Sequence, residues 1–96
     1  MKIGYNIPER EYIDKDALKI MIDSEGLAKE IESVESIYFP IGGDSLFSLH
    51  VNRVSIVYSE QKNLLIGVGE DGPTINSSLK KLVEEFRKTG ILRPRA

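Results

Sequence analysis

The residue best suited to acid–base chemistry is His50, the only histidine in the chain. A nucleophilic relay would need a serine and an acid beside it, and Ser48 and Asp44 are the nearest along the sequence. Two residues on one face of a strand lie about 7 Å apart, which is too far for a direct hydrogen bond between Ser48 and His50. We therefore expect His50 to be solvated or to make one structural hydrogen bond, and we predict no catalytic residues.

A glycine-rich run from Gly67 to Gly72 matches the pattern G-x-G-x-x-G and follows an apolar stretch. In dinucleotide-binding proteins such a run opens a helix whose N-terminal N–H groups hold a pyrophosphate. Here Glu70 and Asp71 put negative charge where phosphate would lie, and Pro73 with several further residues is expected to separate the glycines from the next helix. We expect a turn that ends a strand, and no cofactor.

The composition removes most other kinds of active site. The chain has no cysteine and a single histidine, so it lacks thiolate ligands, a cysteine nucleophile and any multi-histidine metal site. Paired acids occur at Asp14 and Asp16 and at Glu84 and Glu85, but the sequence gives them no apolar pocket of the kind that acid catalysis uses. We predict a protein that is not an enzyme and binds no metal.

Length and hydropathy set the scale on which these residues must be positioned. With 96 residues, 41% of them hydrophobic and 29% charged, the chain has the composition of one globular domain over residues 1–96. No apolar run approaches the ~18 residues of a membrane-spanning helix, and the first five residues contain no apolar signal region. The sequence therefore predicts a cytoplasmic location without membrane contact.

The net charge of −2 conceals an asymmetry along the chain. Residues 9–44 contain ten acids and four bases, a net charge of −6, whereas residues 77–96 contain six bases and two acids, a net charge of +4. An acidic half repels nucleic acid and attracts basic proteins. The alternative interpretation is two solvated helix faces of opposite sign.

The first third of the chain allows two interpretations. Residues 1–13 show no clear period and are expected to be an irregular segment. Residues 17–22 alternate as a strand would, and Asp23 or Ser24 is a suitable N-cap for a helix over about 24–34. A single bent helix over 16–34 is the alternative, because the apolar residues also fit one helical stripe.

Short strands are predicted for the middle of the chain. Residues 36–41 alternate, and Pro40 marks them as an edge strand because it cannot donate a hydrogen bond to a neighbour. Gly42 to Asp44 suit a tight hairpin. Alternating strands follow at 47–51 and 54–58, and the continuous apolar run 64–66 is typical of a strand covered on both faces. Strands joined by such short links are expected to form an antiparallel meander.

The C-terminal part carries the clearest helical pattern, over about 77–89. Leu79, Leu82, Val83 and Phe86 form one apolar face, a residue of the Asn76–Ser78 run is expected to cap the start, and Gly90 suits the C-terminal cap. Residues 91–96 are expected to form a mobile tail. Together the elements predict an α+β fold, a four- to five-stranded antiparallel meander with two helices packed on it.

The strand end from Leu65 to Gly72 resembles that of small bacterial immunity proteins, which protect cells from nuclease or deaminase toxins of contact-dependent inhibition and polymorphic toxin systems. The likeness covers residues 17–76: a strand, a Ser-capped helix, and short strands ending in Leu65-Ile66-Gly67-Val68-Gly69-Glu70-Asp71-Gly72. The resemblance implies a non-catalytic protein that binds one cognate toxin and blocks it.

Nuclease toxins are usually basic because they bind phosphates, so an acidic binder would gain association rate and specificity. On this hypothesis a protein partner is bound by acidic positions together with a tyrosine that offers apolar area with a polar tip. The expected contact residues are Asp23, Glu25, Asp44, Glu70, Asp71 and Tyr38.

An alternative to toxin binding is a small regulatory or assembly domain. It would act as a homodimer through the edge strand at 36–41 or the last helix, or as a subunit of a larger complex. Nucleic acid is not expected as a partner, since the overall balance is acidic and the basic segment lacks interleaved aromatic residues. The sequence leaves the oligomeric state open.

Overall fold

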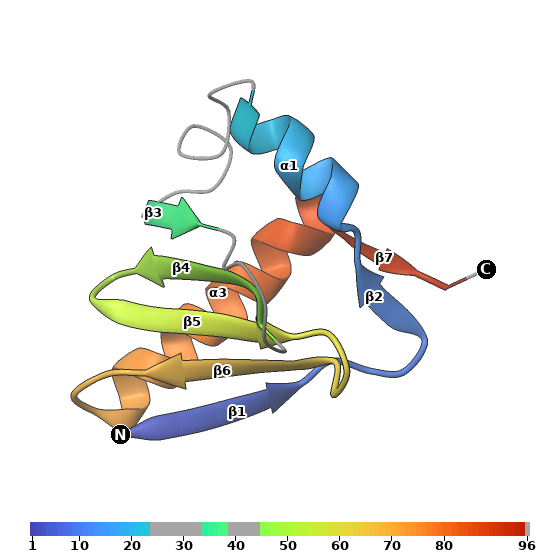
Figure 1. The fold of residues 1–96 in the computed structure, drawn as a ribbon. Coiled ribbons are helices and arrows are strands. Elements are labelled where there is room, and N and C mark those ends of the chain that lie inside the picture. Colours follow the sequence, from blue (N-terminus) through green and yellow to red (C-terminus); the bar gives the residue numbers. More distant parts are fainter. Residues whose placement is uncertain (24–33, 39–44, 96) are drawn as a thin grey trace.

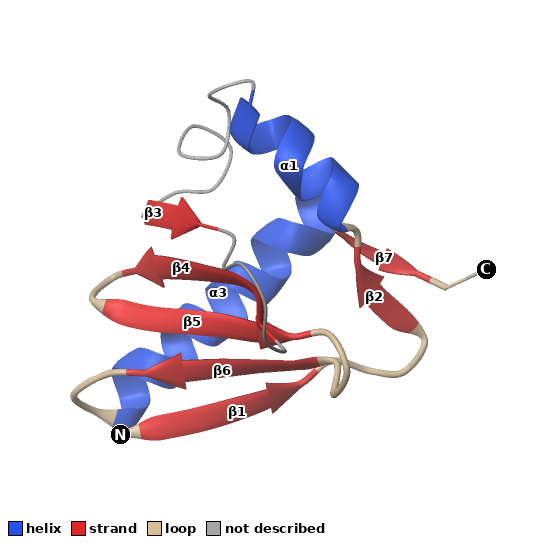
Figure 2. Cartoon of the chain, in the orientation of Figure 1, coloured by secondary structure: helices blue, strands red, loops and turns tan. Residues whose placement is uncertain are grey.

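The computed structural model describes residues 1–23, 34–38 and 45–95, with side chains for residues 1–20 and 47–95. Its main feature is a five-stranded antiparallel sheet in the order β1-β6-β5-β4-β3, with helix α3 (Gly72–Thr89) behind one face (Figure 1). The predicted α+β class is confirmed (Figure 2). The strands are β1 (Lys2–Asn6), β3 (Val34–Tyr38), β4 (Ser45–Val51), β5 (Val54–Ser59) and β6 (Leu64–Val68).

Strands β3 to β6 form the predicted meander, with each strand antiparallel to the next. β3 lies at an edge of the sheet, as Pro40 indicated. The other edge is β1, which pairs antiparallel with β6 and was not predicted. The sheet is therefore completed by the first residues of the chain.

Two expectations for the ends of the chain are wrong. Residues 1–13 are not irregular, because they hold β1 and β2 (Glu11–Ile13), and β2 pairs with β7 (Leu92–Pro94) in a second, two-stranded sheet. The segment 91–95 is not a loose tail either, since Ile91 and Leu92 are buried in the core. Each of these short strands is stabilised by a partner far away in the sequence, which local patterns do not reveal.

The strand predicted at 17–22 is also wrong, because these residues belong to helix α1 (Lys15–Asp23). Asp14 begins the helix: its Oδ1 accepts hydrogen bonds from the backbone N–H groups of Asp16 and Ala17, both at 3.1 Å. Leu18 anchors the helix in the core. The alternative helix over 16–34 agrees better at its start, but Val34 already belongs to β3. The rest of the helix predicted over 24–34 lies outside the described residues.

Helix α3 starts about five residues earlier than predicted. Its N-cap is Asp71, not a residue of the Asn76–Ser78 run, and Pro73 lies in the first turn, where no helical N–H bond is lost. The predicted end is confirmed, because Gly90 caps the helix with a φ of 79°. The glycine-rich run therefore does open a helix.

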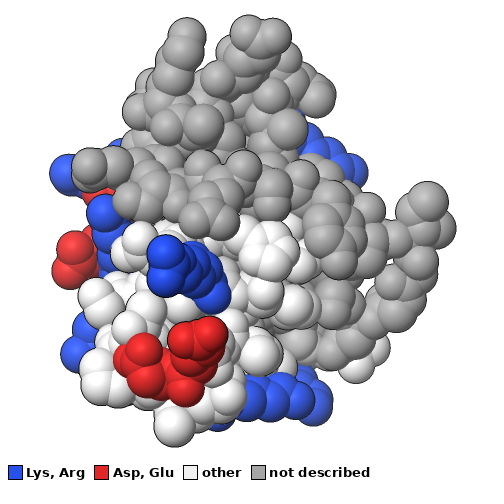
Figure 3. All heavy atoms as spheres, turned by 90° about the vertical axis from the view of Figure 1, so that its left-hand side faces the viewer, with Lys and Arg blue, Asp and Glu red and all other residues white. Residues whose placement is uncertain are grey.

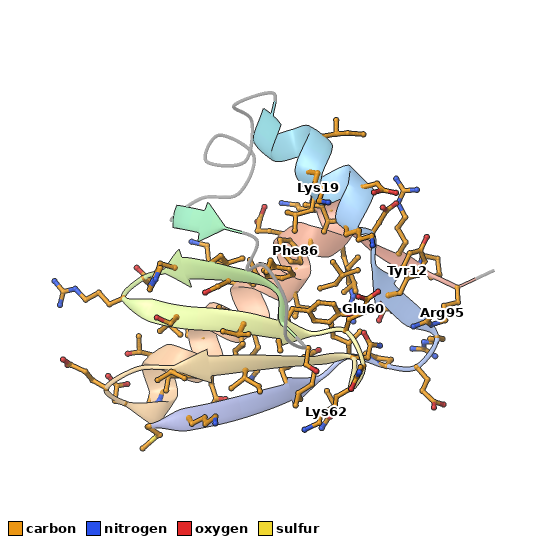
Figure 4. All side chains as sticks on the ribbon, in the orientation of Figure 1. Tyr12, Lys19, Glu60, Lys62, Phe86 and Arg95 are labelled. Atoms are coloured by element: carbon orange, nitrogen blue, oxygen red, sulfur yellow. The ribbon has the colours of Figure 1, made fainter. Side chains whose placement is uncertain are left out.

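The core lies between α3 and the sheet face that it covers. The ring of Phe47 stacks on that of Tyr58 with centroids 5.6 Å apart and meets Phe86, which is labelled in Figure 4, edge-on at 6.0 Å, so all three rings belong to the core. Gly67 lets the helix approach closely, since a Cβ on it would lie 2.7 Å from Cγ2 of Ile75.

Asn63, in the turn after β5, connects the two sheets. Its φ is 49°, and its side-chain N–H₂ donates to the backbone oxygen of Glu11 at 3.0 Å. Its Oδ1 accepts from the Tyr58 hydroxyl at 2.6 Å. Burial raises the pKa of that hydroxyl. These bonds hold the chain between β1 and β2 against the main sheet.

Candidate protein-binding surface

The face of the five-stranded sheet that points away from α3, here called the open face, carries a band of apolar side chains. Val57 lies opposite Ile66 in the β5–β6 register, and Ile66 lies opposite Gly4 in β1. The other members are Leu64 and Val68, and Val68 is 44% exposed. Figure 1 views the molecule from this side, with α3 behind the sheet. The apolar band therefore consists of Val57, Leu64, Ile66 and Val68.

This band corrects the expectation that residues 64–66 lie in a strand covered on both faces. Leu65 is fully buried toward α3, but Leu64 and Ile66 are only half-buried. Nearer to β4 the side chains of the open face are less exposed, since Ser48 is only 8% exposed. Exposure is thus concentrated on the β5–β6–β1 side of the sheet. Adjoining apolar side chains that reach the surface, as Val68 does at 44% exposed, are one mark of a protein-binding surface.

His50 lies on the same face, and its partner is Ser55, its cross-strand neighbour in β5. The Oγ of Ser55 lies 3.1 Å from Nδ1 of His50. A serine–histidine pair is part of a hydrolytic relay, but a relay also needs an acid to orient the imidazole. Among the side chains that the structure describes, no hydrogen bond or ion pair joins His50 to a carboxylate. Within the described residues, His50 thus makes one side-chain hydrogen bond, to Ser55.

Two loops lie together at one end of the open face. The turn between β4 and β5 supplies Asn52 and Arg53, and the loop between β6 and α3 supplies Glu70 and Asp71. With Thr74 they line a shallow pocket of about 180 Å³. Figure 3 looks onto this end of the molecule and shows acidic side chains gathered next to basic ones. The end of the open face is therefore charged.

The two acids of this loop have different roles. Asp71 caps α3: its Oδ1 accepts from the backbone N–H of Thr74 at 2.8 Å, and its Oδ2 accepts from the hydroxyl of Thr74 at 3.0 Å. These hydrogen bonds hold the pKa of Asp71 below its usual value. A carboxylate of the chain itself thus occupies the helix N-terminus where the glycine motif would have held phosphate. Glu70 is exposed and makes no ion pair with any side chain that the structure describes.

The turn beside this loop is strained. Asn52 and Arg53 have φ angles of 52° and 65°, which is the backbone of a type I′ hairpin turn. Asn tolerates this conformation, but the second position strongly favours glycine, and an arginine there costs about 1 kcal/mol. Such outliers cluster at sites of function. Arg53 is exposed at the tip of the turn.

The predicted contact residues are only partly brought together. Glu70 and Asp71 are adjacent at the end of the open face, and Tyr38 ends β3 at a register position opposite Ser48. Asp23 ends α1, which lies on the opposite side of the molecule from the β6–α3 loop (Figure 1). Glu25 and Asp44 lie outside the described residues.

The basic C-terminal segment is folded against the acidic N-terminal one. Arg87 binds both carboxylate oxygens of Glu11, at 3.0 and 2.9 Å. This hydrogen-bonded pair lowers the pKa of Glu11 and raises that of Arg87. The guanidinium of Arg95 lies 5.5 Å from the ring centre of Tyr12 (Figure 4). At Glu11 and Asp14 the two charged segments therefore neutralise each other, through Arg87 and Arg93.

Comparison of the chain with protein-family models, with curated proteins and with solved structures gives no match. Within the described ranges, no group of three or more His, Asp or Glu side chains could hold a metal ion. Neither described helix has the length and hydropathy that a bilayer crossing requires.

Two features of this surface escaped the sequence analysis. The His50–Ser55 pair depends on the β4–β5 register, which puts Ser55 rather than Ser48 beside the imidazole. The strained turn could have been recognised, because two residues between alternating strands leave room only for a tight turn with positive φ.

Proposed function

We propose that this chain is a non-catalytic, cytoplasmic protein-binding module whose docking surface is the apolar band together with the charged loops at its end. The observation that carries the proposal is the band itself, Val57, Leu64, Ile66 and Val68, apolar and partly exposed on a sheet face whose other side packs on α3. The occupant is a protein with an apolar contact surface and a basic rim that complements Glu70 and Asp71.

The resemblance of residues 65–72 to immunity proteins indicates which protein that is. We infer a cognate bacterial toxin domain of the nuclease or deaminase kind, which this chain binds and neutralises. The exposed charge of Glu70 supports the inference, because a basic toxin would be steered to an acidic rim. The strained turn at Arg53 supports it as well, since strain of this kind is kept where a loop makes specific contacts.

The test is a binding measurement with the protein encoded immediately upstream, co-expressed with this chain. Ile66→Thr removes apolar area from the band, and Ile20→Thr is the matched control, since Ile20 is a 69% exposed isoleucine on α1. We expect Ile66→Thr to weaken binding by about tenfold, the loss typical of one truncated anchor, and Ile20→Thr to leave it unchanged. Equal effects, or no complex at all, would refute the proposal.

The rim is tested by charge reversal. Glu70→Lys should lower the association rate about threefold to tenfold at low salt, with a smaller change in the dissociation rate. Glu84→Lys makes the same change on the solvent side of α3 and serves as the control. If both variants slow association equally, net charge rather than this rim steers the partner.

A further inference from the structure

The two edges of the five-stranded sheet differ in their protection against pairing. The β3 edge has a register shift between Val34 and Ser36, and Pro40 follows it in the sequence. β1 pairs with β6 in continuous register from Lys2 to Asn6 and contains no proline. Bulges and prolines are among the devices by which natural sheets keep their edges from pairing. Of the two, the β1 edge is the one prepared to accept a further strand.

The hydrogen bonds of β1 show which groups point outward. Met1 and Gly69 exchange N–H···O bonds at 2.7 and 3.0 Å, and the N–H of Ile7 donates to Asn63 at 3.0 Å. Alternate residues of a strand direct their N–H and C=O to the same side, so odd-numbered residues face β6. Lys2, Gly4 and Asn6 therefore present their backbone groups to the open edge, where the described part of the chain has no further strand.

This edge is complementary to itself. If a second β1 lies antiparallel with Gly4 opposite Gly4, Lys2 lies opposite Asn6 and Ile3 lies opposite Tyr5. Every outward-pointing residue then falls in a hydrogen-bonded pair, and each such pair exchanges two N–H···O bonds. No like charges are directly opposite one another, which would be destabilising.

The side chains fit the same register. Ile3 and Tyr5 lie on the α3 side, partly buried against the core, and would meet as non-hydrogen-bonded pairs, in which side chains are closest. On the open face the twofold axis passes through Gly4, which has no side chain to obstruct the approach. A Cβ there would lie 3.3 Å from Cδ1 of Leu64, so Leu64 reaches over Gly4 toward the partner copy.

We propose that the chain forms a homodimer by antiparallel pairing of β1 with β1 of a second copy, about a twofold axis at Gly4. The two sheets become one, and the apolar bands of the two copies form a single surface. This inference is independent of the proposed toxin binding, because pairing of two β1 strands needs no other protein and is measured by the mass of the purified chain in solution.

The decisive variant is Gly4→Pro. The N–H of Gly4 points away from β6, so proline removes an intermolecular donor and no intramolecular one. Gly4→Ala is the matched control, since it adds the Cβ and keeps the donor. We expect sedimentation equilibrium to give twice the 10.8 kDa chain mass for the wild type and Gly4→Ala, and the monomer mass for Gly4→Pro. Circular dichroism checks that each variant is folded, and Asn6→Pro replaces Gly4→Pro if it is not.

A second measurement locates the axis. The chain has no cysteine, so Gly4→Cys introduces the only thiol, and a short bis-maleimide should cross-link it to its counterpart. Lys62→Cys, in the β5–β6 turn, is the control and should remain monomeric on a denaturing gel. A monomeric wild type, or a dimer that survives Gly4→Pro, would overturn the proposal. A monomer whose toxin binding is lost in Gly4→Pro would instead assign the edge to a strand of the toxin.

Discussion

The two faces of the five-stranded sheet are made by the same strands but differ in almost every respect. Toward α3, the described residues of β4 and β5 are all large and buried: Phe47, Leu49, Val51, Val54, Ile56 and Tyr58. On the open face these strands carry Ser48, His50, Ser55 and Val57, and the apolar side chains lie mainly on β6. Helix α3 covers one face, whereas the described part of the chain covers the other face only in part.

The difference teaches how to interpret a strand that is apolar on both sides. In β4 and β5 the apolar residues that face α3 are buried, and the residues between them are mostly polar, as expected for an antiparallel sheet covered on one face. In β6 it does not, because Leu64 and Ile66 are apolar without full cover. Apolar residues on a strand face that the described part of the chain leaves partly exposed indicate that another molecule binds there.

The largest expected difference between the faces is the cost of removing a side chain. Phe47→Ala should lower the free energy of unfolding by about 3–5 kcal/mol, because the ring is fully buried between Tyr58 and Phe86. Ile66→Ala on the open face should cost less, about 1–2 kcal/mol, since the side chain is only partly buried. Urea denaturation followed by circular dichroism measures both. A comparable cost for the two would mean that the open face is as tightly packed as the core.

Such a loss would leave little stability in a 96-residue domain. Phe47→Leu is therefore the milder variant to measure if Phe47→Ala does not fold. It retains part of the contact with Tyr58 and should fall between wild type and alanine.

The next effect concerns glycine on the two faces. Gly67→Ala should cost about 1–3 kcal/mol, since its Cβ would lie 2.7 Å from Cγ2 of Ile75, and overpacking forces the helix away. Gly4→Ala on the open face meets only the flexible end of Leu64 at 3.3 Å and should change stability by less than about 0.5 kcal/mol.

A double variant separates overpacking from other causes. Ile75→Leu removes the Cγ2 methyl, so Gly67→Ala combined with it should cost less than the sum of the single changes. Additive costs in this cycle would show that the loss at Gly67 does not arise from contact with Ile75.

The sequence predicts the elements that depend on neighbouring residues, and it misses the elements that depend on residues far away in the chain. The strands at 47–51 and 54–58 and the helix end at Gly90 rest on local alternation and on a residue that tolerates positive φ, so they are confirmed. β1, β2 and β7 are fixed by partners distant in the chain, such as Ile3 with Gly67 and Ile13 with Leu92. A three-residue strand has no period to detect.

The candidate site divides in the same way. Glu70 and Asp71 could be predicted from the sequence as surface residues, because acidic residues in loops are exposed. The sequence did not reveal that Asp71 caps α3. Asn76, Ser77 and Ser78 are residue types that cap helices as well as Asp71 does. The close packing of Gly67 on Ile75 favours a helix that already begins at Gly72. The apolar band required the register that aligns Val57 with Ile66.

A smaller effect is expected at the turn where β4 passes into β5, at the charged end of the open face. Arg53→Gly should raise the free energy of unfolding by about 0.5–1 kcal/mol, because glycine adopts a φ of 65° without strain. Asn52→Gly is the control and should gain less, since Asn already tolerates positive φ. The same Arg53→Gly protein should bind the upstream partner more weakly. A variant that is stabilised and binds normally would remove Arg53 from the proposed surface.

The smallest effect lies on the α3 side, where Arg87 pairs with Glu11. The pKa of Glu11 is lowered below its ordinary 4.5 mainly by its hydrogen bonds with Arg87, so the pair stabilises the folded state above pH 4.5. That contribution is lost as the pH falls through the folded-state pKa. Because the Arg87 side chain is 45% exposed, it amounts to about 0.5 kcal/mol. Arg87→Gln should therefore be less stable than wild type at pH 7, and the two should converge as the pH falls below 4.5. Lys88→Gln removes the adjacent charge as a control, and convergence of that variant too would assign the effect to net charge instead of the pair.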